Sequence, residues 1–318
     1  VIAMHMHIPE QETKEALQTT SSFIKWIYIA ICTGIFGGVV VVLSILCFLI
    51  ILYPLWFVVI ASISNSDLVN QGKVTFLPVD IRFYGYQQVF TDHRIWNGYM
   101  NTIIYVVAGT ALNLAVTMPA AYALSRPDFR ARNPVMMYFV FTMYFSGGTI
   151  PIYLNVKDFH MLDTMWSLII PGLLSTYNMI IMKSFFASLP NELEEAATID
   201  GANDFQILLQ VYLPLSLASI ATLTLFYAVG KWNSFADAKY YIQTRALQPL
   251  QLRLYNIIKG STAVDVTAIE GNANSNAQNV SESIESATII FATLPILVVY
   301  PFVQRYFVSG VTIGAVKG

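Results

Sequence analysis

Charge is scarce in this sequence. Asp, Glu, Lys and Arg make up 11% of its 318 residues, whereas a soluble domain carries about 25%. Hydrophobic residues account for 56%, and the formal net charge is -2. The absence of a basic excess argues against a nucleic-acid partner. The shortage of charge places the chain among membrane proteins, with lipid as its surroundings.

Cysteine is scarce as well, and this excludes two kinds of stabilising site. The two cysteines, Cys32 and Cys47, lie in or beside an apolar run, so we expect two small buried hydrophobic residues rather than a disulfide framework. Their spacing matches no zinc or redox motif, and no metal site is expected. The sequence also lacks the pattern GxxxxGK[ST], so we expect no ATP site of the P-loop kind and no cofactor in this chain.

The apolar residues lie in windows without charge. A helix that crosses a bilayer needs about 20 mostly apolar residues, and six charge-free windows are long enough. They predict an all-α, polytopic membrane protein with six transmembrane helices. The expected spans are 35–61, 98–124, 134–156, 165–185, 213–232 and 286–304.

The positive charges between the spans predict the orientation. The short loop 126–132 carries Arg126, Arg130 and Arg132, and the tail 305–318 carries Arg305 and Lys317. Because short loops rich in Lys and Arg stay in the cytoplasm, we expect this loop, the tail 305–318 and the tail 1–34 to be cytoplasmic. The transmembrane domain 35–304 then has a long outer loop, 233–284.

The centre of that outer loop is rich in Asn, Ser and Gly. Such a composition is typical of a flexible linker. It is equally compatible with a loop that contacts an external partner or its cargo. In that second interpretation the contact residues are Asn272, Asn274 and Asn276.

An acidic segment interrupts the apolar pattern. It reads "EEAATIDGANDFQILLQVYLPLS" from 194 to 216. Pro190 suits the first turn of a helix and Asn191 suits its cap, while Gly201 is a natural left-handed stop. Asn203 or Asp204 then caps a second short helix. The segment 188–212 therefore predicts a helix–turn–helix elbow at the inner membrane surface.

Two interpretations of the elbow remain open from its residues alone. A surface-lying connector is common in membrane proteins. A helix that combines carboxylates with the small residues Ala196 and Ala197 is instead suited to the groove of a soluble partner, where it would act as a rigid lever on the spans.

The spacing of this segment carries a family resemblance. Glu195-Ala196-Ala197, then Gly201 after three residues and Leu213-Pro214 after eleven more, resembles the "EAA" motif of bacterial binding-protein-dependent ABC importer permeases. The family usually has Ile where this chain has Val211. The stretches 145–186 and 300–318 resemble the carbohydrate branch, and within it the lipoprotein/polysaccharide-type permeases. The likeness covers nearly the whole chain after residue 35.

The resemblance implies a type I ABC importer permease fold and a set of partners. The elbow would be the coupling helix, seated in a cleft of a cytoplasmic ATPase subunit. The expected assembly is a heterodimer with a second homologous permease, two ATPase subunits that bind ATP and Mg²⁺, and an extracytoplasmic solute-binding protein. This chain would be the counterpart of the shorter maltose-type subunit, in the bacterial inner membrane. The residues carried over to the ATPase contact are Glu194, Glu195, Ala196, Ala197, Asp200, Gly201 and Ala202.

Polar and aromatic residues within the spans are candidates for the cargo path. Sugars are held by hydrogen bonds and aromatic faces, although Tyr near a span end often marks the membrane interface and a buried Asn often bonds a neighbouring helix. Ser146-Gly147-Gly148 is either a flexible gate or, as we favour, a tight packing point. The candidate path residues are Tyr105, Asn113, Tyr138, Tyr144 and Asn178.

Two other functions stay open at this stage. A secondary carrier is disfavoured because the spans hold almost no ionisable residue, and proton-coupled carriers retain such residues for function. A membrane enzyme acting on lipid-linked sugars would need an ordered acid, base or metal set, and the outer-loop carboxylates show no recognisable spacing. An ATP-driven importer of an oligosaccharide, itself not an enzyme, agrees best with these residues.

Overall fold

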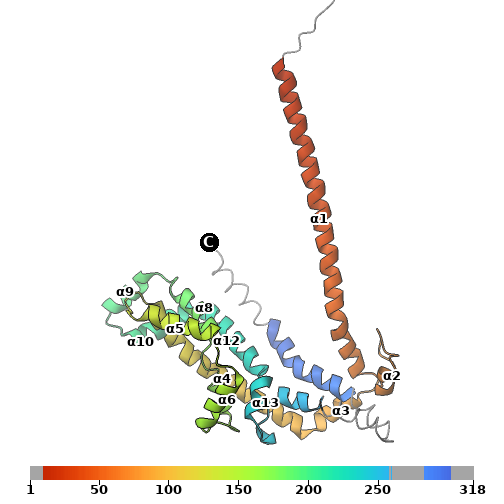
Figure 1. Cartoon of the computed structure of the whole chain (residues 1–318), viewed down its shortest axis with the longest axis vertical. Helices are drawn as coiled ribbons and strands as arrows, with labels where there is room; N and C mark the ends of the chain where they lie inside the picture. The colour runs from red at the N-terminus through yellow and green to blue at the C-terminus, as the bar shows by residue number, and fades with distance from the viewer. Residues whose placement is uncertain (1–9, 258, 260–282, 302–318) are drawn as a thin grey trace, which may run out of the picture. The chain divides into compact units, whose positions relative to one another are not determined.

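The computed structural model describes residues 10–257, 259 and 283–301, and every regular element within them is a helix. It divides into two compact units, residues 1–57 and 58–318. Figure 1 labels the principal helices. In chain order they are α1 (Glu10–Ser62), α2 (Ser66–Asn70), α3 (Tyr84–Thr91), α4 (His93–Ser125), α5 (Arg132–Tyr144), α6 (Thr149–Asp158), α7 (Trp166–Ile169), α8 (Thr176–Phe186), α9 (Asn191–Ile199), α10 (Asp204–Ile207), the π-helical turn η1 (Leu208–Tyr212), α11 (Leu213–Leu215), α12 (Leu217–Trp232), α13 (Phe235–Tyr241) and the 3-10 turn η2 (Arg245–Leu247). Residues 250–257 are also helical, and a last helix covers Ser283–Pro301.

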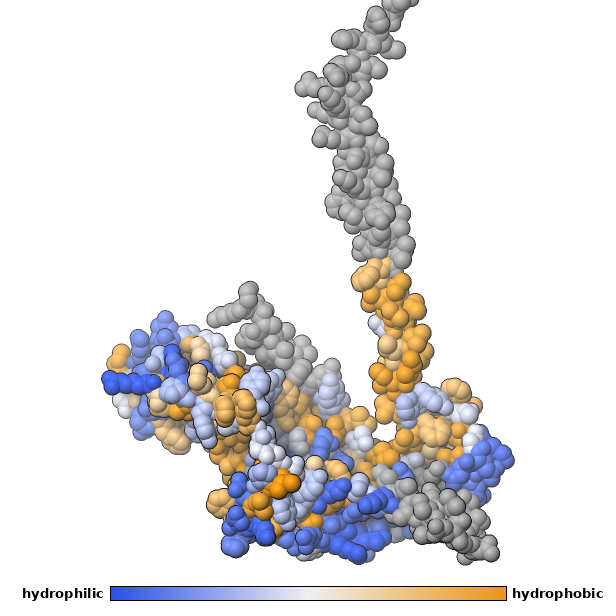
Figure 2. Space-filling model, in the orientation of Figure 1, coloured by the Kyte–Doolittle hydropathy of each residue, from blue (hydrophilic) through white to orange (hydrophobic). Residues whose placement is uncertain are grey.

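Three of the predicted windows are continuous helices long enough to cross a membrane. They are Phe36–Ser62 within α1, His93–Ser125 and Ser283–Pro301. The side chains of Phe36–Ser62 are almost all apolar, and Figure 2 shows this stretch as a hydrophobic surface. The helix α1 starts at Glu10, so the predicted tail 1–34 is helical over its described part.

Two further windows are bent pairs of helices. The pair α5 and α6 bends by 115°, and the pair Asp204–Leu215 and Leu217–Trp232 bends by 88°. If each pair counts as one span, the described residues hold up to five spans. Within the predicted span 213–232, the turn at Ser216 separates α11 from α12, and α12 starts at Leu217.

The remaining window, 165–185, is broken into α7 and α8. The break contains Pro171-Gly172, and a proline removes a helical N–H while its ring clashes with the preceding turn. The expectation of uninterrupted helices therefore holds for three of the six windows. The sequence pattern located all six apolar segments but not the breaks inside them.

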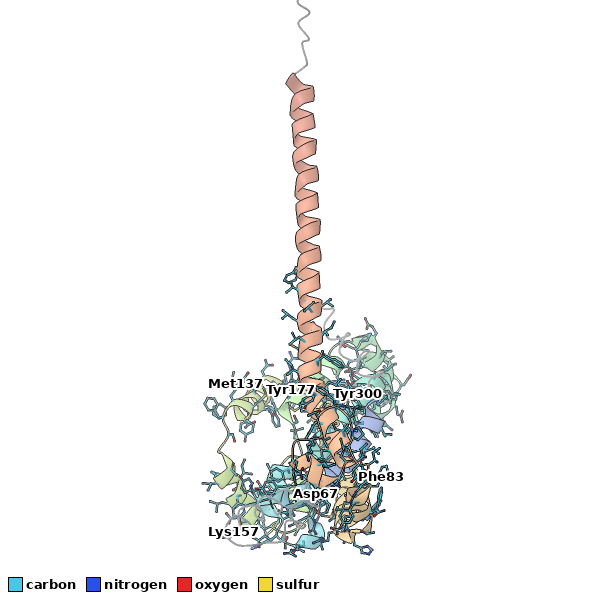
Figure 3. All side chains as sticks on the ribbon, turned by 90° about the vertical axis from the view of Figure 1, so that its right-hand side faces the viewer. Asp67, Phe83, Met137, Lys157, Tyr177 and Tyr300 are labelled. Atoms are coloured by element: carbon cyan, nitrogen blue, oxygen red, sulfur yellow. The ribbon has the colours of Figure 1, made fainter. Side chains whose placement is uncertain are left out.

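Three buried clusters contact α4 at different levels, and one of them joins Ile95 of α4 to Val89 of α3 and Trp232 of α12. The cluster named here the inner core joins Met118, Tyr122 and Leu124 of α4 to α8, η1 and α12. A second cluster, the outer core, joins Tyr105 of α4 to Val156 of α6 and to α7 and α13. Figure 3 shows Met137 on α5 and Lys157 on α6 at clearly different heights. The inner and outer cores therefore pack at two different levels of the same long helix.

The predicted outer loop 233–284 is folded over its first half. The helix α13 and residues 250–257 bury Ala238, Tyr241, Leu250 and Leu252. These apolar residues pack into buried clusters of the chain. The linker interpretation concerned the centre of the loop, which lies almost entirely outside the described residues. The candidate contacts Asn272, Asn274 and Asn276 lie outside the described residues.

Candidate functional site

The elbow has the predicted helix–turn–helix form. The helix α9 ends at Ile199, and Gly201 adopts a φ of 84°, which confirms the left-handed stop. The second helix is held by a capping box, since Asn203 Oδ1 accepts from the Gln206 N–H at 2.9 Å and Gln206 Oε1 accepts from the Asn203 N–H at 2.9 Å. The predicted cap Asn203 is therefore confirmed.

The start of the elbow differs from the prediction by one residue. Pro190 occupies the N-cap position of α9 with a ψ of 133°, and no side chain caps this end. Asn191 is already the first helical residue, so its side chain does not serve as the expected cap. The acidic residues Glu192 and Glu194 lie in the first turn, where the positive end of the helix dipole stabilises negative charge.

The carboxylate of Glu194 turns into the protein. It forms an ion pair with Arg126, the residue that follows α4, and accepts a hydrogen bond of 2.7 Å from the hydroxyl of Tyr212. The side chains of Arg126 and Glu194 are only 14% and 18% exposed. This three-residue set, here called the elbow anchor, ties α9 to α4 and to η1.

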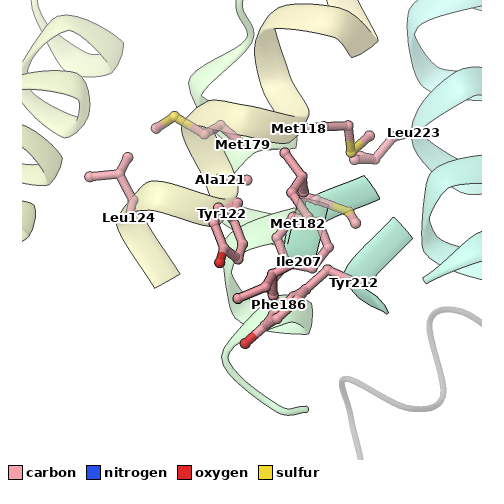
Figure 4. Packing of buried hydrophobic residues seen from close by; sticks show 11 residues of the cluster. Met118, Ala121, Tyr122, Leu124, Met179, Met182, Phe186, Ile207, Tyr212 and Leu223 are labelled. Atoms are coloured by element: carbon pink, nitrogen blue, oxygen red, sulfur yellow. The ribbon is translucent and has the colours of Figure 1, made fainter. Parts of the chain in front are cut away.

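Aromatic residues of the inner core pack against the elbow anchor. Arg126 lies 5.5 Å from the ring centroid of Tyr122 and donates to its hydroxyl at 3.2 Å. Tyr122 in turn packs edge-on against Tyr212, with ring centroids 4.9 Å apart, and Phe186 packs against both rings. In Figure 4 the hydroxyls of Tyr122 and Tyr212 point the same way. A displacement of α9 would therefore move the packed end of α4.

The opposite side of the elbow is open to solvent. Glu195, Ala196, Asp200 and Gly201 are exposed, while Ala197 and Ala202 are half-buried against the inner core. Figure 2 shows hydrophilic residues gathered at the α9–α10 end of the molecule. Of the two adjacent glutamates, Glu194 holds the elbow to its own chain and Glu195 remains available to a partner.

Two apolar side chains of the elbow are exposed among these polar groups. Ile199 is 85% exposed and Phe205 is 64% exposed. Between the two helices lies a largely polar hollow of about 450 Å³, lined by residues that include Asp200, Gly201 and Gln206. The sequence analysis did not single out Ile199. An isoleucine directly before Asp200-Gly201, at the end of a helix, could have indicated an exposed apolar side chain at this turn. Exposed apolar tips beside carboxylates suit a partner surface that is partly basic and partly apolar.

The candidate path residues do not form one cluster. Tyr105, Asn113 and Asn178 are buried within this chain. The hydroxyl of Tyr105 donates to the Leu247 carbonyl at 2.7 Å, so it holds η2 in place. Tyr138 and Tyr144 of α5 are instead 66% and 75% exposed. Only these two of the five are accessible on the described surface of the chain.

The sequence assigned no role to Lys231, which lies near the end of the predicted span 213–232. Its Nζ donates to the Leu168 carbonyl at 2.7 Å and to the Ile169 carbonyl at 3.3 Å, at the end of α7. Its hydrocarbon stem passes Gly109, where a Cβ would lie 3.1–3.3 Å from the Lys231 carbons. Lys231 thus caps the broken span, and a lone lysine following Gly230 was the signal in the sequence.

A further loop contact lies outside the predicted spans. Asp163 accepts from the Gln243 N–H at 3.0 Å and from the Thr244 N–H at 2.8 Å. The hydroxyl of Thr244 also donates to it, and these hydrogen bonds lower the pKa of the Asp163 carboxyl. The contact fastens the loop after α6 to the segment after α13.

Residues 15–313 match the family described as "Binding-protein-dependent transport system inner membrane component". The chain belongs to this family. It is 38% identical over 270 residues to the polygalacturonan/rhamnogalacturonan transport system permease protein YtcP of Bacillus subtilis (strain 168), covering 85% of this chain and 94% of that one. It is 39% identical over 288 residues to protein LplC of the same organism, covering 91% and 94% of the two chains.

A solved structure agrees with these relatives. It is described as a bacterial ABC transporter involved in the import of the acidic polysaccharide alginate. One of its chains aligns with a TM-score of 0.77 and 38% identity, over 86% of this chain and 96% of that one. The family and this likeness confirm the predicted all-α fold of type I importer permeases and a place in the inner membrane as a transport subunit.

Proposed function

We propose that this chain is one permease of an ATP-driven importer for an oligosaccharide or polysaccharide, and that its elbow receives the motion of a cytoplasmic ATPase. The observation that carries the proposal is the elbow itself. One side is fastened to α4 by the elbow anchor, and the other presents Glu195 and Ile199 to solvent. This is the arrangement expected of a lever between a soluble partner and a membrane span.

Each elbow residue takes a distinct role in this proposal. Glu195 faces a basic group of the ATPase subunit, and Ala196 and Ala197 allow close approach. Asp200, Gly201 and Ala202 form the turn, and Gly201 supplies the positive φ that other residues rarely adopt. Glu194 is a positioning residue, since its carboxylate is bonded within the chain.

The assembly proposed around the chain follows the family. It comprises a second homologous permease, two ATPase subunits that bind ATP and Mg²⁺, and an extracytoplasmic binding protein that delivers cargo. The elbow, the loop 126–132 and both termini face the cytoplasm, and Asn272, Asn274 and Asn276 remain proposed contacts of the binding protein. Orientation is supported by the arginines of the 126–132 loop.

The cargo proposed is an acidic oligosaccharide. Support comes from the printed names of two similar proteins, one for polygalacturonan and rhamnogalacturonan and one for alginate. Of the candidate path residues, Tyr138 and Tyr144 are the proposed cargo contacts, because they alone of the five are accessible. Tyr105, Asn113 and Asn178 then act by holding the walls of the path.

Co-purification tests the ATPase contact. The chain is expressed with its neighbouring permease and a candidate ATPase, as wild type, Glu195→Gln and Glu195→Lys. We expect the wild type to retain the ATPase, the neutral variant to retain most of it, and the reversed charge to release it. Retention of the ATPase by Glu195→Lys at the wild-type level would contradict a basic partner at this position.

A further inference from the structure

The predicted span 213–232 contains a lysine whose positive charge no carboxylate neutralises. Lys231 lies in the last turn of α12, and its Nζ donates to the carbonyls of Leu168 and Ile169 at 2.7 Å and 3.3 Å. Carbonyl oxygens accept the hydrogen bonds of an ammonium but leave its net charge in place. Asp237, the acidic residue nearest to it in the sequence, is exposed on α13. Among the described residues no ion pair includes Lys231.

The contacts of Lys231 bring its ammonium level with the centre of a membrane-crossing helix. Helical side chains lean toward the N-terminus, so the side chain runs back along α12 from the last turn. Its hydrocarbon stem passes Gly109, where an added Cβ would lie 3.1–3.3 Å from the stem carbons. Gly109 is the central residue of α4, His93–Ser125, which is long and apolar enough to cross a membrane. The ammonium therefore lies near the middle of the bilayer.

A charge at that depth does not face lipid. Charged side chains within spans are costly in hydrocarbon, and they turn to the protein interior or to a water-filled cavity. Lys231 is half-buried, and the exposed Gly172 lies beside its amine. A Cβ added to Gly172 would lie 3.6 Å from Nζ, so a larger residue there would stand against the amine. The glycine leaves this approach to the charge open.

A second source of positive potential lies at the same break. The helix α8 begins there, and the N–H of its N-cap residue Ser175 donates to the hydroxyl of Tyr227 at 3.3 Å. Tyr227 precedes Lys231 by one turn of α12, so the two side chains share a face of that helix. The N-terminus of a helix carries the positive end of its dipole. The break between α7 and α8 therefore combines two features that favour an anion.

Capping alone does not require a charge at this position. An uncharged donor such as an amide can also donate to the carbonyls of Leu168 and Ile169, without the cost of an ion inside the membrane. The charge of Lys231 is therefore unexplained by its contacts within the chain. An ionisable residue in a span indicates a function for the charge itself.

We infer that Lys231 binds a carboxylate of the cargo as the sugar passes the middle of the membrane, and that it thereby favours acidic sugars. The inference rests on the proposed function, in which the cargo is an acidic oligosaccharide. An ammonium has three N–H donors. Those that bond the carbonyls of Leu168 and Ile169 hold the broken span, and the remaining donor forms a charge-assisted hydrogen bond with a uronate oxygen.

The amount of sugar moved per ATP hydrolysed tests this role. The transporter is reconstituted in proteoliposomes with its second permease, ATPase and binding protein, and labelled oligogalacturonide uptake and ATP hydrolysis are measured together. Lys231→Gln keeps an uncharged donor, and Lys231→Arg keeps the charge. Tyr227→Phe is the matched control, because it removes the hydroxyl that bonds Ser175 and Thr117 at the same break without changing any charge.

The ratio separates a cargo contact from a structural cap. A damaged break would lower uptake and stimulated ATP hydrolysis together, whereas a lost cargo contact lowers uptake per ATP. We expect Lys231→Gln to lower the ratio at least about ten-fold, the effect of one lost hydrogen bond to a charged group. Lys231→Arg and Tyr227→Phe should keep the wild-type ratio. A wild-type ratio in Lys231→Gln, or an equal fall in Tyr227→Phe, would overturn the inference.

A second measurement needs no variant. The methyl ester of the same oligogalacturonide lacks the negative charges, and we expect the wild type to move at least about ten-fold less of it per ATP than of the acid. An equal ratio for the two sugars would overturn the inference. Failure of the wild type to take up the acid at all would instead contradict the proposed cargo, so the two failures are distinguishable.

Discussion

The elbow anchor predicts that Glu194→Gln loosens the elbow while the rest of the chain stays folded. The substitution removes the negative charge that faces Arg126 but keeps an oxygen that can accept from Tyr212. An exposed ion pair contributes under about 1 kcal/mol, and breaking a fully buried pair costs about 3–5 kcal/mol. With side chains 14% and 18% exposed, we expect a value between these limits, about 1.5–3 kcal/mol, in the range of hydrogen bonds to charged groups.

The assay is amide hydrogen exchange of residues 191–199 in the assembled transporter. Since local opening controls exchange, and about 1.4 kcal/mol is a factor of ten, exchange should accelerate about 10-fold to 100-fold. The matched control is Glu195→Gln, whose side chain is exposed and whose loss should leave these rates unchanged. Equal exchange in Glu194→Gln and the wild type would refute the anchor, and equal acceleration in both variants would refute the distinction between the two glutamates.

Three further variants test other parts of the structure. Lys231→Met keeps the stem but leaves the Leu168 and Ile169 carbonyls without their donor, so it should lower the free energy of unfolding by about 1–3 kcal/mol; an unchanged thermal midpoint in detergent would contradict the cap. Gly201→Val should weaken stimulation of ATP hydrolysis by the binding protein far more than Gly201→Asn. A Cβ at position 201 would have open space, so a substitution acts only through the backbone strain of a positive φ, about 1–2 kcal/mol. Asn tolerates a positive φ better than Val, so a similar loss of stimulation in both variants would contradict this explanation. The pKa of Asp163 is lowered in the folded chain. The stabilisation that its hydrogen bonds give is therefore fully present above the ordinary pKa of an Asp, near 4, and is lost as the pH falls through the lowered pKa. Exchange of the Thr244 amide, corrected for intrinsic rates, should stay constant from neutral pH to about 4 and be fast in Asp163→Asn at neutral pH; protection that disappears near pH 6 would contradict this.

The sequence predicted the features that depend on local chemistry. The elbow was predictable because Gly201 and Asn203 act within a few residues of themselves, through a positive φ and a capping box. The apolar windows were predictable because lipid excludes charge over about 20 residues. These rules need no knowledge of which segments meet.

The parts that the sequence did not predict depend on contacts between distant segments. Whether Glu194 or Glu195 faces a partner depends on Arg126, which lies 68 residues earlier in the sequence. Lys231 looked like the end of a span because nothing local shows that its amine reaches the carbonyl of Leu168. The break at 145–148 was not predicted either, because it depends on α5 and α6 packing at different levels along α4.

The most direct test of the central claim is ATP-dependent uptake. The transporter is reconstituted in proteoliposomes with its binding protein, and labelled oligogalacturonide is followed with the wild type and with Glu195→Lys, alongside Glu195→Gln. The account predicts uptake that requires ATP in the wild type, that persists in the neutral variant and that is lost on charge reversal although the chain remains inserted. Uptake by Glu195→Lys at the wild-type rate would contradict the claim that the elbow transmits the work of an ATPase.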